Sequence, residues 1–279
     1  MCSQVPQVIR DGVRLHYADV GSGPAVFFHT GGGGDGTMWQ AAGYLNKLPG
    51  RRYLLYDHRG HGRSDQPVSV EAHQFDEYVA DVIAVMDSAG VDRAAMIGYS
   101  DGARLIYGLA ARHPERVAAV VGIGGVAHPN DTDDWRRPLA AEVREIGVRS
   151  YIERMSASET EPVPRWLIDN LGSTATEMFA LELDGWADAP NDSEHFRRIE
   201  APTLIVCGDT ENTDGAAELA VDALSNGASV VIPGFGHLQA FWRTDVTAPI
   251  ISDFLARHVP VLPPHRVGRS APLAEPGGA

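Results

Sequence analysis

A series of short apolar runs, each about the length of a strand, constrains the fold more than any other feature of the sequence. Uninterrupted runs of this kind are typical of strands that are buried on both faces, as in a parallel sheet. A half-buried strand would instead alternate apolar and polar residues. The runs occupy residues 25–28, 53–56, 94–97, 117–123, 203–207 and 229–232. They predict a mostly parallel sheet.

Amphipathic helices are predicted between these runs. From Phe75 to Met86 the apolar residues recur at i, i+3, i+4, i+7, i+8 and i+11, and Gly90 ends the pattern. A second helical pattern follows Ser100 and ends at His113-Pro114. Because strands alternate with helices, the fold class is predicted to be α/β.

Three regions lie outside this alternation. Residues 7–18 have the pattern of a hairpin around the turn Asp11-Gly12. A later region has aromatic residues on what we interpret as several short helices, with no strand pattern, and the C-terminal residues are rich in proline. The predicted domains are a core of residues 1–127 and 196–259, a helical cap of residues 128–195, and a flexible tail of residues 260–279.

Composition excludes several classes of protein. The 279 residues carry a net charge of −14 and no basic stripe, so nucleic acid is not an expected partner. Cys2 and Cys207 do not suggest a disulfide framework, which fits a reducing compartment. The longest mostly apolar run, Val117 to Ala127, is about half the length of a membrane span, and the first residues lack a secretory signal pattern. We therefore expect a cytoplasmic protein without a membrane segment, as a monomer or a homodimer.

A serine lies between two glycines directly after one of the predicted strands. The segment Gly98-Tyr99-Ser100-Asp101-Gly102 matches the G-x-S-x-G pattern of a nucleophile elbow, in which the serine occupies a strained turn between a strand and a helix. In an open parallel sheet, ligands bind at the carboxyl ends of the strands. This position predicts that Ser100 is a nucleophile and not a residue of an ordinary glycine turn.

A serine hydroxyl needs a base to remove its proton, and the base needs an acid to orient it. Among the eleven histidines, His237 is the candidate base, because it lies in a glycine loop just past the final predicted strand. Three carboxylates follow the preceding predicted strand, those of Asp209, Glu211 and Asp214. The chain order serine, acid, histidine is that of α/β-hydrolases.

With these residues the sequence resembles the α/β-hydrolase fold family over nearly all of residues 7–258. The resemblance rests on His29-Thr30-Gly31-Gly32, the segment Asp57 to Asp65 (Asp-His-Arg-Gly-His-Gly-Arg-Ser-Asp), the Ser100 elbow, the Gly208 loop and Gly236-His237. It implies an α/β-hydrolase fold with a mostly parallel central sheet, flanking helices and a helical lid. The Ser-Asp-Gly elbow is similar to that of valacyclovir-hydrolase-type esterases, which cleave amino-acid esters.

The resemblance also implies the remaining catalytic roles. In the family the acid lies three residues after the loop glycine, which is Glu211 here. Because the usual residue is aspartate, Asp209 remains an alternative, and Asp131 is a further one, since some members draw the acid from beyond the strand after the elbow. The oxyanion hole would use the backbone amides of Gly31 and Asp101.

No metal or cofactor is predicted. His58 and His61, with Asp57 and Asp65, could suggest a metal cluster, but the interleaved glycines disfavour a rigid ligand face. The resemblance implies that this segment is a structural loop beside the site. The glycine-rich run at 31–36 lacks the lysine and hydroxyl that close a P-loop, so nucleotide binding is not expected.

The predicted function is hydrolysis of a carboxylic ester or lactone of a small molecule through an acyl-enzyme. A serine at the elbow points to acyl transfer, whereas an aspartate would indicate an epoxide hydrolase or a haloalkane dehalogenase. One alternative is carbon-carbon bond hydrolysis, or cofactor-free perhydrolysis of the haloperoxidase kind, on the same triad. Another is a non-catalytic ligand-binding protein, against which the intact Ser100 and His237 argue.

Candidate substrate contacts are Thr30, Asp101, Trp135 and Trp166. The Asp101 carboxylate would attract an amine-bearing acyl group, or it would pair with a nearby arginine. Residues 128–195 hold fifteen acidic and six basic residues, and so nine of the fourteen net negative charges. This charge would steer cations toward the pocket or form a solvated surface. The cap's aromatic residues would form an apolar roof over the pocket or pack among themselves.

Overall fold

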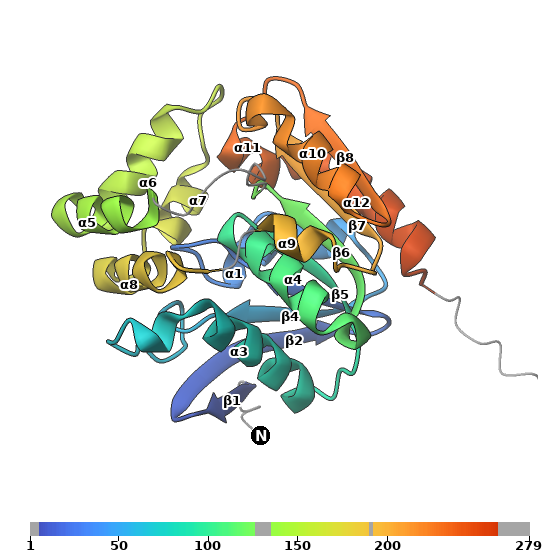
Figure 1. Ribbon diagram of the computed structural model, residues 1–279, viewed down its shortest axis with the longest axis horizontal. Coiled ribbons are helices and arrows are strands. Elements are labelled where there is room, and N and C mark those ends of the chain that lie inside the picture. The colour runs from blue at the N-terminus through green and yellow to red at the C-terminus, as the bar shows by residue number, and fades with distance from the viewer. Residues whose placement is uncertain (1–5, 126–134, 190–191, 262–279) are drawn as a thin grey trace, which may run out of the picture.

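The fold is built on an eight-stranded sheet (Figure 1) in a computed structural model that describes residues 6–125, 135–189 and 192–261. The strand order is β1-β2-β4-β3-β5-β6-β7-β8. Strand β2 pairs antiparallel with β1 and β4, and all other neighbours pair parallel, which confirms the predicted mostly parallel sheet. The strands are β1 (Gln7–Arg10), β2 (Val13–Gly21), β3 (Ala25–His29), β4 (Arg52–Asp57), β5 (Ala94–Tyr99), β6 (Val117–Ile123), β7 (Thr203–Gly208) and β8 (Gly227–Ile232).

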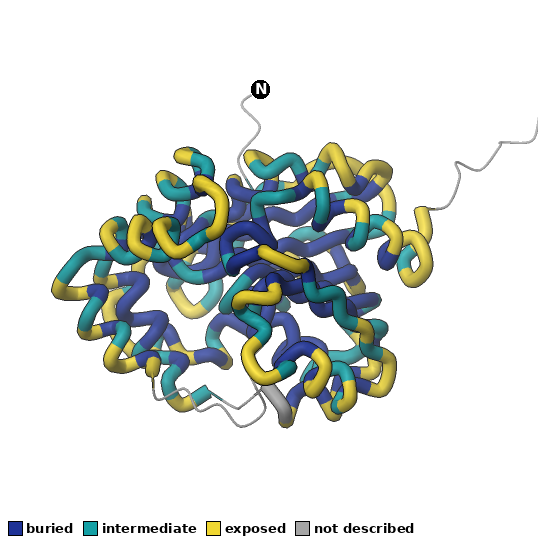
Figure 2. The backbone as a smooth tube through the Cα atoms, turned by 90° about the horizontal axis from the view of Figure 1, so that it is seen from above, coloured by how far each residue is buried: buried dark blue, intermediate teal, exposed yellow. Residues whose placement is uncertain are grey.

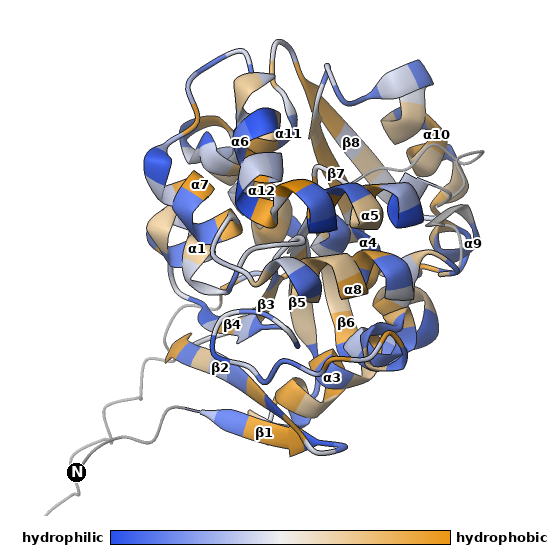
Figure 3. Ribbon diagram, turned by 90° about the vertical axis from the view of Figure 1, so that its left-hand side faces the viewer, coloured by the Kyte–Doolittle hydropathy of each residue, from blue (hydrophilic) through white to orange (hydrophobic). Residues whose placement is uncertain are grey.

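The central strands are buried on both faces. In β5, Ala95 and Ile97 belong to the hydrophobic cluster on one face of the sheet, and Ala94 and Met96 belong to the cluster on the other. Figure 2 shows buried chain through the middle of the molecule, and Figure 3 shows hydrophobic colours along the central strands. The apolar runs are uninterrupted because successive side chains enter two different cores.

Helices cover both faces of the sheet. The predicted helix at 75–86 is confirmed as α3, whose Tyr78, Val82 and Met86 are fully buried. One face packs against α1 (Thr37–Ala41), α2 (Tyr44–Lys47), α11 (His237–Trp242) and α12 (Thr244–His258), and the other against α3 (Phe75–Ser88), α4 (Asp101–Arg112), α9 (Asp192–Phe196) and α10 (Ala216–Ala223).

Four of the five described α-helices between β6 and β7, which we call the cap helices, form a group beside one end of the sheet (Figure 1). They are α5 (Arg136–Ile146), α6 (Val148–Ala157), α7 (Arg165–Leu171) and α8 (Thr176–Trp186). Helix α9, most of which we predicted in the cap, instead packs against α4 of the core. The predicted domain limits at 127/128 and 195/196 remain predictions, and nearly all of the predicted tail lies outside the described residues.

The N-terminal hairpin is confirmed. Arg10 pairs with Val13 across the turn, and Asp11 and Gly12 both have positive φ, 48° and 81°. Two positive φ values are what a two-residue type I′ turn requires, and they explain the Asp-Gly sequence. Among the described helices, none combines the length and the apolar character needed to cross a bilayer.

Candidate active site

The elbow residue Ser100 lies at the turn between β5 and α4 with φ 56° and ψ −126°. This is a strained conformation for a residue with a side chain. The flanking glycines are required because the backbone folds back on itself. A Cβ at Gly98 would lie 2.3 Å from the Gly102 carbonyl oxygen, and a Cβ at Gly102 would lie 2.4 Å from the Thr30 carbonyl oxygen. The glycine spacing in the sequence therefore reflects close approach of the backbone on both sides of the serine.

The structure brings Ser100, His237 and Glu211 together from the ends of three strands. His237 Nε2 lies 3.0 Å from Ser100 Oγ, and His237 Nδ1 lies 2.6 Å from Glu211 Oε2. The backbone N–H of Gly208 donates a hydrogen bond of 3.0 Å to Glu211 Oε1, which holds the carboxylate in place. This arrangement can move a proton from the hydroxyl to the imidazole while the carboxylate orients the ring.

The electrostatics of the pair favour its charged form. Burial acts to lower the pKa of His237, but the charge of Glu211 and its hydrogen bond outweigh burial and raise the pKa above the usual 6.5. Burial acts to raise the pKa of Glu211, but His237 outweighs it and the pKa is lowered. Both shifts stabilise the imidazolium and carboxylate that form when the imidazole accepts the serine proton.

The other candidate acids lie elsewhere. Asp209 is exposed, and its Oδ1 accepts a hydrogen bond of 2.9 Å from the Gly234 N–H, so it supports the loop before His237 and does not face the imidazole. Asp214 is exposed in a left-handed turn with φ 51°. Asp131 lies outside the described residues. Among the described candidates, only Glu211 contacts His237.

The two residues predicted to supply the oxyanion hole are neighbours of Ser100. A Cβ at Gly31 would lie 2.6 Å from the Ser100 Cβ, so only glycine lets the backbone of this loop approach the nucleophile. Asp101 is the first residue of α4, and the first backbone amides of a helix have no partner within the helix. Both residues therefore lie beside the serine, and the role of their amides in the oxyanion hole remains a prediction.

A second pair of glycines packs against the triad and was not singled out from the sequence. A Cβ at Gly124, where φ is +47°, would lie 3.0 Å from His237 Nδ1, and a Cβ at Gly125 would lie 2.5 Å from the Ser100 carbonyl oxygen. Both follow β6 directly. Their place just past a predicted strand, at the edge where ligands bind, is the signal that could have identified them.

A pocket of about 320 Å³ opens over Ser100 and His237. Its apolar wall comes mainly from the cap helices and is formed by Leu139, Ile152, Met155, Leu171, Phe179 and Leu183. Of the predicted substrate contacts, Asp101 and Trp135 line this pocket. Thr30 does not line the pocket; it is buried, and its hydroxyl lies 3.1 Å from His58 Nδ1. Trp166 does not line the pocket either, and it packs against the hydrophobic core.

The carboxylate of Asp101 is held by an arginine of the cap. Arg136 Nη2 donates to Asp101 Oδ1 at 2.7 Å, and the Arg136 side chain is fully buried. Burial acts to raise the pKa of Asp101, but the Arg136 guanidinium outweighs it and lowers the pKa. Of the two readings of Asp101, the structure supports pairing with an arginine. An ionised carboxylate already paired in this way offers little attraction to a cationic substrate.

A buried polar cluster beside the site joins the core to the cap. His58 Nε2 lies 3.2 Å from Glu182 Oε2, and His61 Nε2 lies 3.6 Å from the same oxygen. Burial lowers the pKa of His58 and of His61 to about 3 and raises the pKa of Glu182 to about 7. Glu182, on α8, was not identified from the sequence, because nothing near it in the chain carries a motif.

The donor atoms of this cluster lie within 4.8 Å of one another, a spacing compatible with a metal ion. In the structure they form hydrogen bonds: the Gly33 N–H donates to His61 Nε2 at 3.1 Å. The His58 and His61 rings pack against each other, with centroids 3.7 Å apart and an angle of 34° between the ring planes. The absence of a metal remains a prediction.

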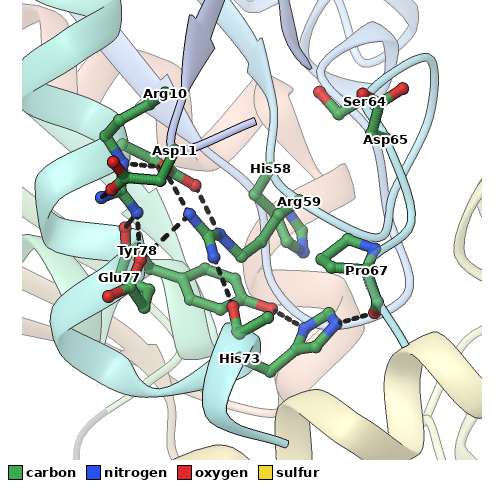
Figure 4. Close-up of polar contacts among 12 residues, drawn as sticks. Arg10, Asp11, His58, Arg59, Ser64, Asp65, Pro67, His73, Glu77 and Tyr78 are labelled. Carbon is green, nitrogen blue, oxygen red and sulfur yellow. Dashed lines mark hydrogen bonds and ion pairs between the residues drawn. The ribbon is translucent and has the colours of Figure 1, made fainter. Parts of the chain in front are cut away.

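The loop that carries His58 and His61 is held in place by the ion pairs of Arg59. Figure 4 shows Arg59 beside Arg10 and Glu77, and Arg59 Nε also pairs with the fully buried Asp81 at 2.7 Å. Such anchoring fits the structural loop implied by the resemblance. The contact of Arg59 with Asp81 fixes the position of the loop, and with it the position of His58 and His61.

Comparisons with known proteins agree with this geometry. A family model described as the alpha/beta hydrolase fold matches residues 24–145. A non-heme haloperoxidase of Rhodococcus erythropolis is 30% identical over 268 residues, which cover 87% of this chain and 96% of the relative. A bifunctional esterase/perhydrolase of Acinetobacter calcoaceticus is 28% identical over 255 residues, 82% of this chain and 91% of that protein.

Among solved structures, the chain is similar to an enol-lactonase from Burkholderia xenovorans. The TM-score is 0.77 at 25% identity, and the match covers 90% of this chain and 100% of the enol-lactonase chain. The chain belongs to the α/β-hydrolase fold family.

Proposed function

We propose that the protein is a serine hydrolase that cleaves a carboxylic ester or lactone of a small molecule through an acyl-enzyme. The observation that carries the proposal is the contact of His237 Nε2 with Ser100 Oγ at 3.0 Å, with Glu211 behind the imidazole at 2.6 Å. The likeness to the Burkholderia enol-lactonase and the Acinetobacter esterase/perhydrolase supports this class of reaction.

In the proposed mechanism, His237 Nε2 accepts the Ser100 proton as Oγ attacks the carbonyl carbon. The negative charge that develops on the carbonyl oxygen is stabilised by the amides of Gly31 and Asp101. The imidazolium then protonates the leaving oxygen, and the acyl-enzyme remains. His237 next removes a proton from water, which attacks the ester carbon, and returns a proton to Oγ as the acid product leaves.

The pocket supports an acyl group of modest size and apolar character. A volume of about 320 Å³ suits a small molecule, and most of the wall is aliphatic or aromatic. A preference for amine-bearing acyl groups is not part of this proposal, because the Asp101 carboxylate is paired with Arg136. Many acidic residues of the cap also pair with cap arginines, for example Glu142 with Arg154, which fits a solvated surface better than a field that attracts cations.

Covalent labelling tests the proposed nucleophile. An alkyl phosphonate probe should label Ser100, detected by peptide mass spectrometry, because the hydroxyl is the group activated by His237. Ser100→Ala should abolish both labelling and p-nitrophenyl ester turnover, and Asp209→Asn serves as the control that should keep both. Labelling at another residue, or none, would count against an acyl-enzyme mechanism.

Perhydrolysis is a second candidate. It is favoured by the likeness to the Rhodococcus haloperoxidase and the Acinetobacter esterase/perhydrolase. Hydrogen peroxide would replace water in attacking the acyl-enzyme, so that a peracid leaves and Oγ regains its proton. Product analysis with peroxide plus acetate separates this reaction from simple hydrolysis, and β-diketone substrates test carbon-carbon bond hydrolysis in the same way.

A further inference from the structure

Three consecutive residues of the cap, Glu159 to Glu161, contact the segment that carries His237. We call Glu159, Thr160 and Glu161 the clamp segment; it lies in the connection between α6 and α7. The Thr160 hydroxyl lies 2.8 Å from both the Gly234 carbonyl oxygen and Gln239 Oε1. Nη1 of Arg243 lies 2.8 Å from both carboxylate oxygens of Glu161.

Glu159 makes the closest approach to the candidate base. Its Oε1 accepts the Leu238 N–H at 2.8 Å, and its Oε2 accepts the Gln239 N–H at 3.2 Å. These are the two backbone amides that directly follow His237. Gly236 permits the approach, because a Cβ at that position would lie 2.3 Å from Glu159 Oε2. The carboxylate thus fixes the backbone immediately after His237, while Gly236 on the other side leaves room for it.

The charge of Glu159 also acts on the imidazole. The charged groups around His237 are Glu211 after β7, Asp101 at the start of α4 with its partner Arg136 of α5, and Glu159 between α6 and α7. Tyr99 of β5 faces the same residue and donates to its carbonyl oxygen at 3.4 Å. After Glu211, Glu159 is the next contributor that raises the pKa of His237.

We propose that Glu159 is a positioning residue for His237: from the cap, it holds the backbone after the imidazole through two hydrogen bonds and stabilises the imidazolium by its charge. This inference rests on the proposed function for its catalytic meaning. It places part of the machinery that orients the base on the cap, so the attachment of the cap and the orientation of His237 are linked. The Glu211 carboxylate orients the ring, and the Glu159 carboxylate orients the chain that bears it.

The titration of the His237 imidazole, followed by NMR in the full-length protein, tests the inference without relying on activity. In Glu159→Gln the pKa of His237 should fall relative to the wild type, because a negative charge near the imidazolium is removed. Glu161→Gln removes the same charge from the same segment but only at Arg243, and it should leave the titration unchanged. Glu159→Asp keeps the charge and should recover part of the wild-type value. An unchanged titration in Glu159→Gln overturns the inference.

Ester kinetics give the second readout. For p-nitrophenyl acetate, Glu159→Gln should lower kcat about tenfold with KM changed less than about twofold, as expected when a group acts on the transition state and not on binding. The acid limb of the kcat/KM profile should move to lower pH. Glu161→Gln should match the wild type, and a profile of Glu159→Gln that also matches it would contradict the positioning role.

The two hypotheses fail in different ways. If the wild type turns over no ester and a phosphonate does not label Ser100, the proposed function fails, while the NMR titration still decides whether Glu159 acts on His237. If the wild type is active and Glu159→Gln leaves both titration and kinetics unchanged, only the positioning role is lost.

Discussion

At the scale of single residues, the glycines around Ser100 and the loops before His237 determine which side chains come into contact in the candidate site. Gly98 and Gly102 let the elbow close, and Gly31 lets the facing loop reach the nucleophile. The two carboxylates Asp209 and Glu211 are two positions apart and have different partners, the Gly234 N–H and the His237 imidazole.

Replacing each carboxylate in turn checks the identity of the acid. Glu211→Gln should lower kcat/KM for a p-nitrophenyl ester by about a thousandfold or more, because the imidazole loses both its orientation and the charge that stabilises it as a cation. Asp209→Asn should lower it by less than about threefold, since its side chain accepts only a loop N–H. Steady-state kinetics of the two variants measure the difference, and a larger loss in Asp209→Asn would reverse the assignment.

At the scale of elements, the cap is joined to the core by buried charged groups as well as by apolar packing. Arg136 of α5 pairs with Asp101 of α4, and Glu182 of α8 contacts His58 of the loop after β4. Buried ion pairs gain little over apolar packing, but removing one partner leaves an uncompensated charge. The relative position of cap and core is therefore sensitive to single substitutions at these contacts.

Arg136→Met tests this junction. The free energy of unfolding should fall by about 3 kcal/mol, because the largely buried Asp101 carboxylate loses the guanidinium with which it pairs. Adding Asp101→Asn to Arg136→Met should recover more than half of the loss. The neighbouring Arg137→Met is the matched control: Arg137 and Asp188 form an ion pair in which both side chains are exposed, so the change should stay within about 1 kcal/mol. Urea unfolding measures all three, and equal losses in Arg136→Met and Arg137→Met would contradict the argument.

At the scale of the whole molecule, several of the described histidines are buried in their neutral form. Burial lowers the pKa of His29, His58 and His61 to about 3 and that of His195 to about 4. The unfolded chain would protonate each of them near pH 6.5. Glu182 acts in the opposite sense, because its raised pKa makes the folded state take up a proton that the unfolded chain does not.

Stability should consequently fall as pH falls below about 6.5, well before carboxylates titrate in the unfolded chain. These four neutral histidines, less one protonated glutamate, give the unfolded state at least three extra protons, which corresponds to about 4 kcal/mol per pH unit between about pH 6 and 5. Burial also lowers the pKa of His73, which acts in the same direction. Urea unfolding at a series of pH values measures the slope. Glu182→Gln should make the slope steeper. A free energy of unfolding that stays constant from pH 6.5 to 5 would rule out neutral buried histidines as the cause.

Much of the fold and of the candidate site could be predicted from local features of the sequence. Strands buried on both faces appear in the sequence as uninterrupted apolar runs, and helices appear as a regular spacing of apolar residues. The elbow appears as glycines at the positions where the backbone approaches itself closely. The α/β architecture, the hairpin at Asp11-Gly12 and the position of Ser100 at a strand end are all of this kind. The roles of Ser100, His237 and Glu211 remain predictions, although the structure brings the three side chains into contact.

The sequence alone determined the order of strands and helices and the strand ends that carry the candidate catalytic residues. It could do so because periodicity and glycine spacing are properties of neighbouring residues. Only the tertiary structure decided that Glu211 and not Asp209 faces His237, that Arg136 holds Asp101, and that Glu159 of the cap reaches the amides after His237. Each of these contacts depends on how a loop or a cap helix lies against a distant part of the chain. Such placement follows from packing in three dimensions, which leaves no pattern in the residues on either side.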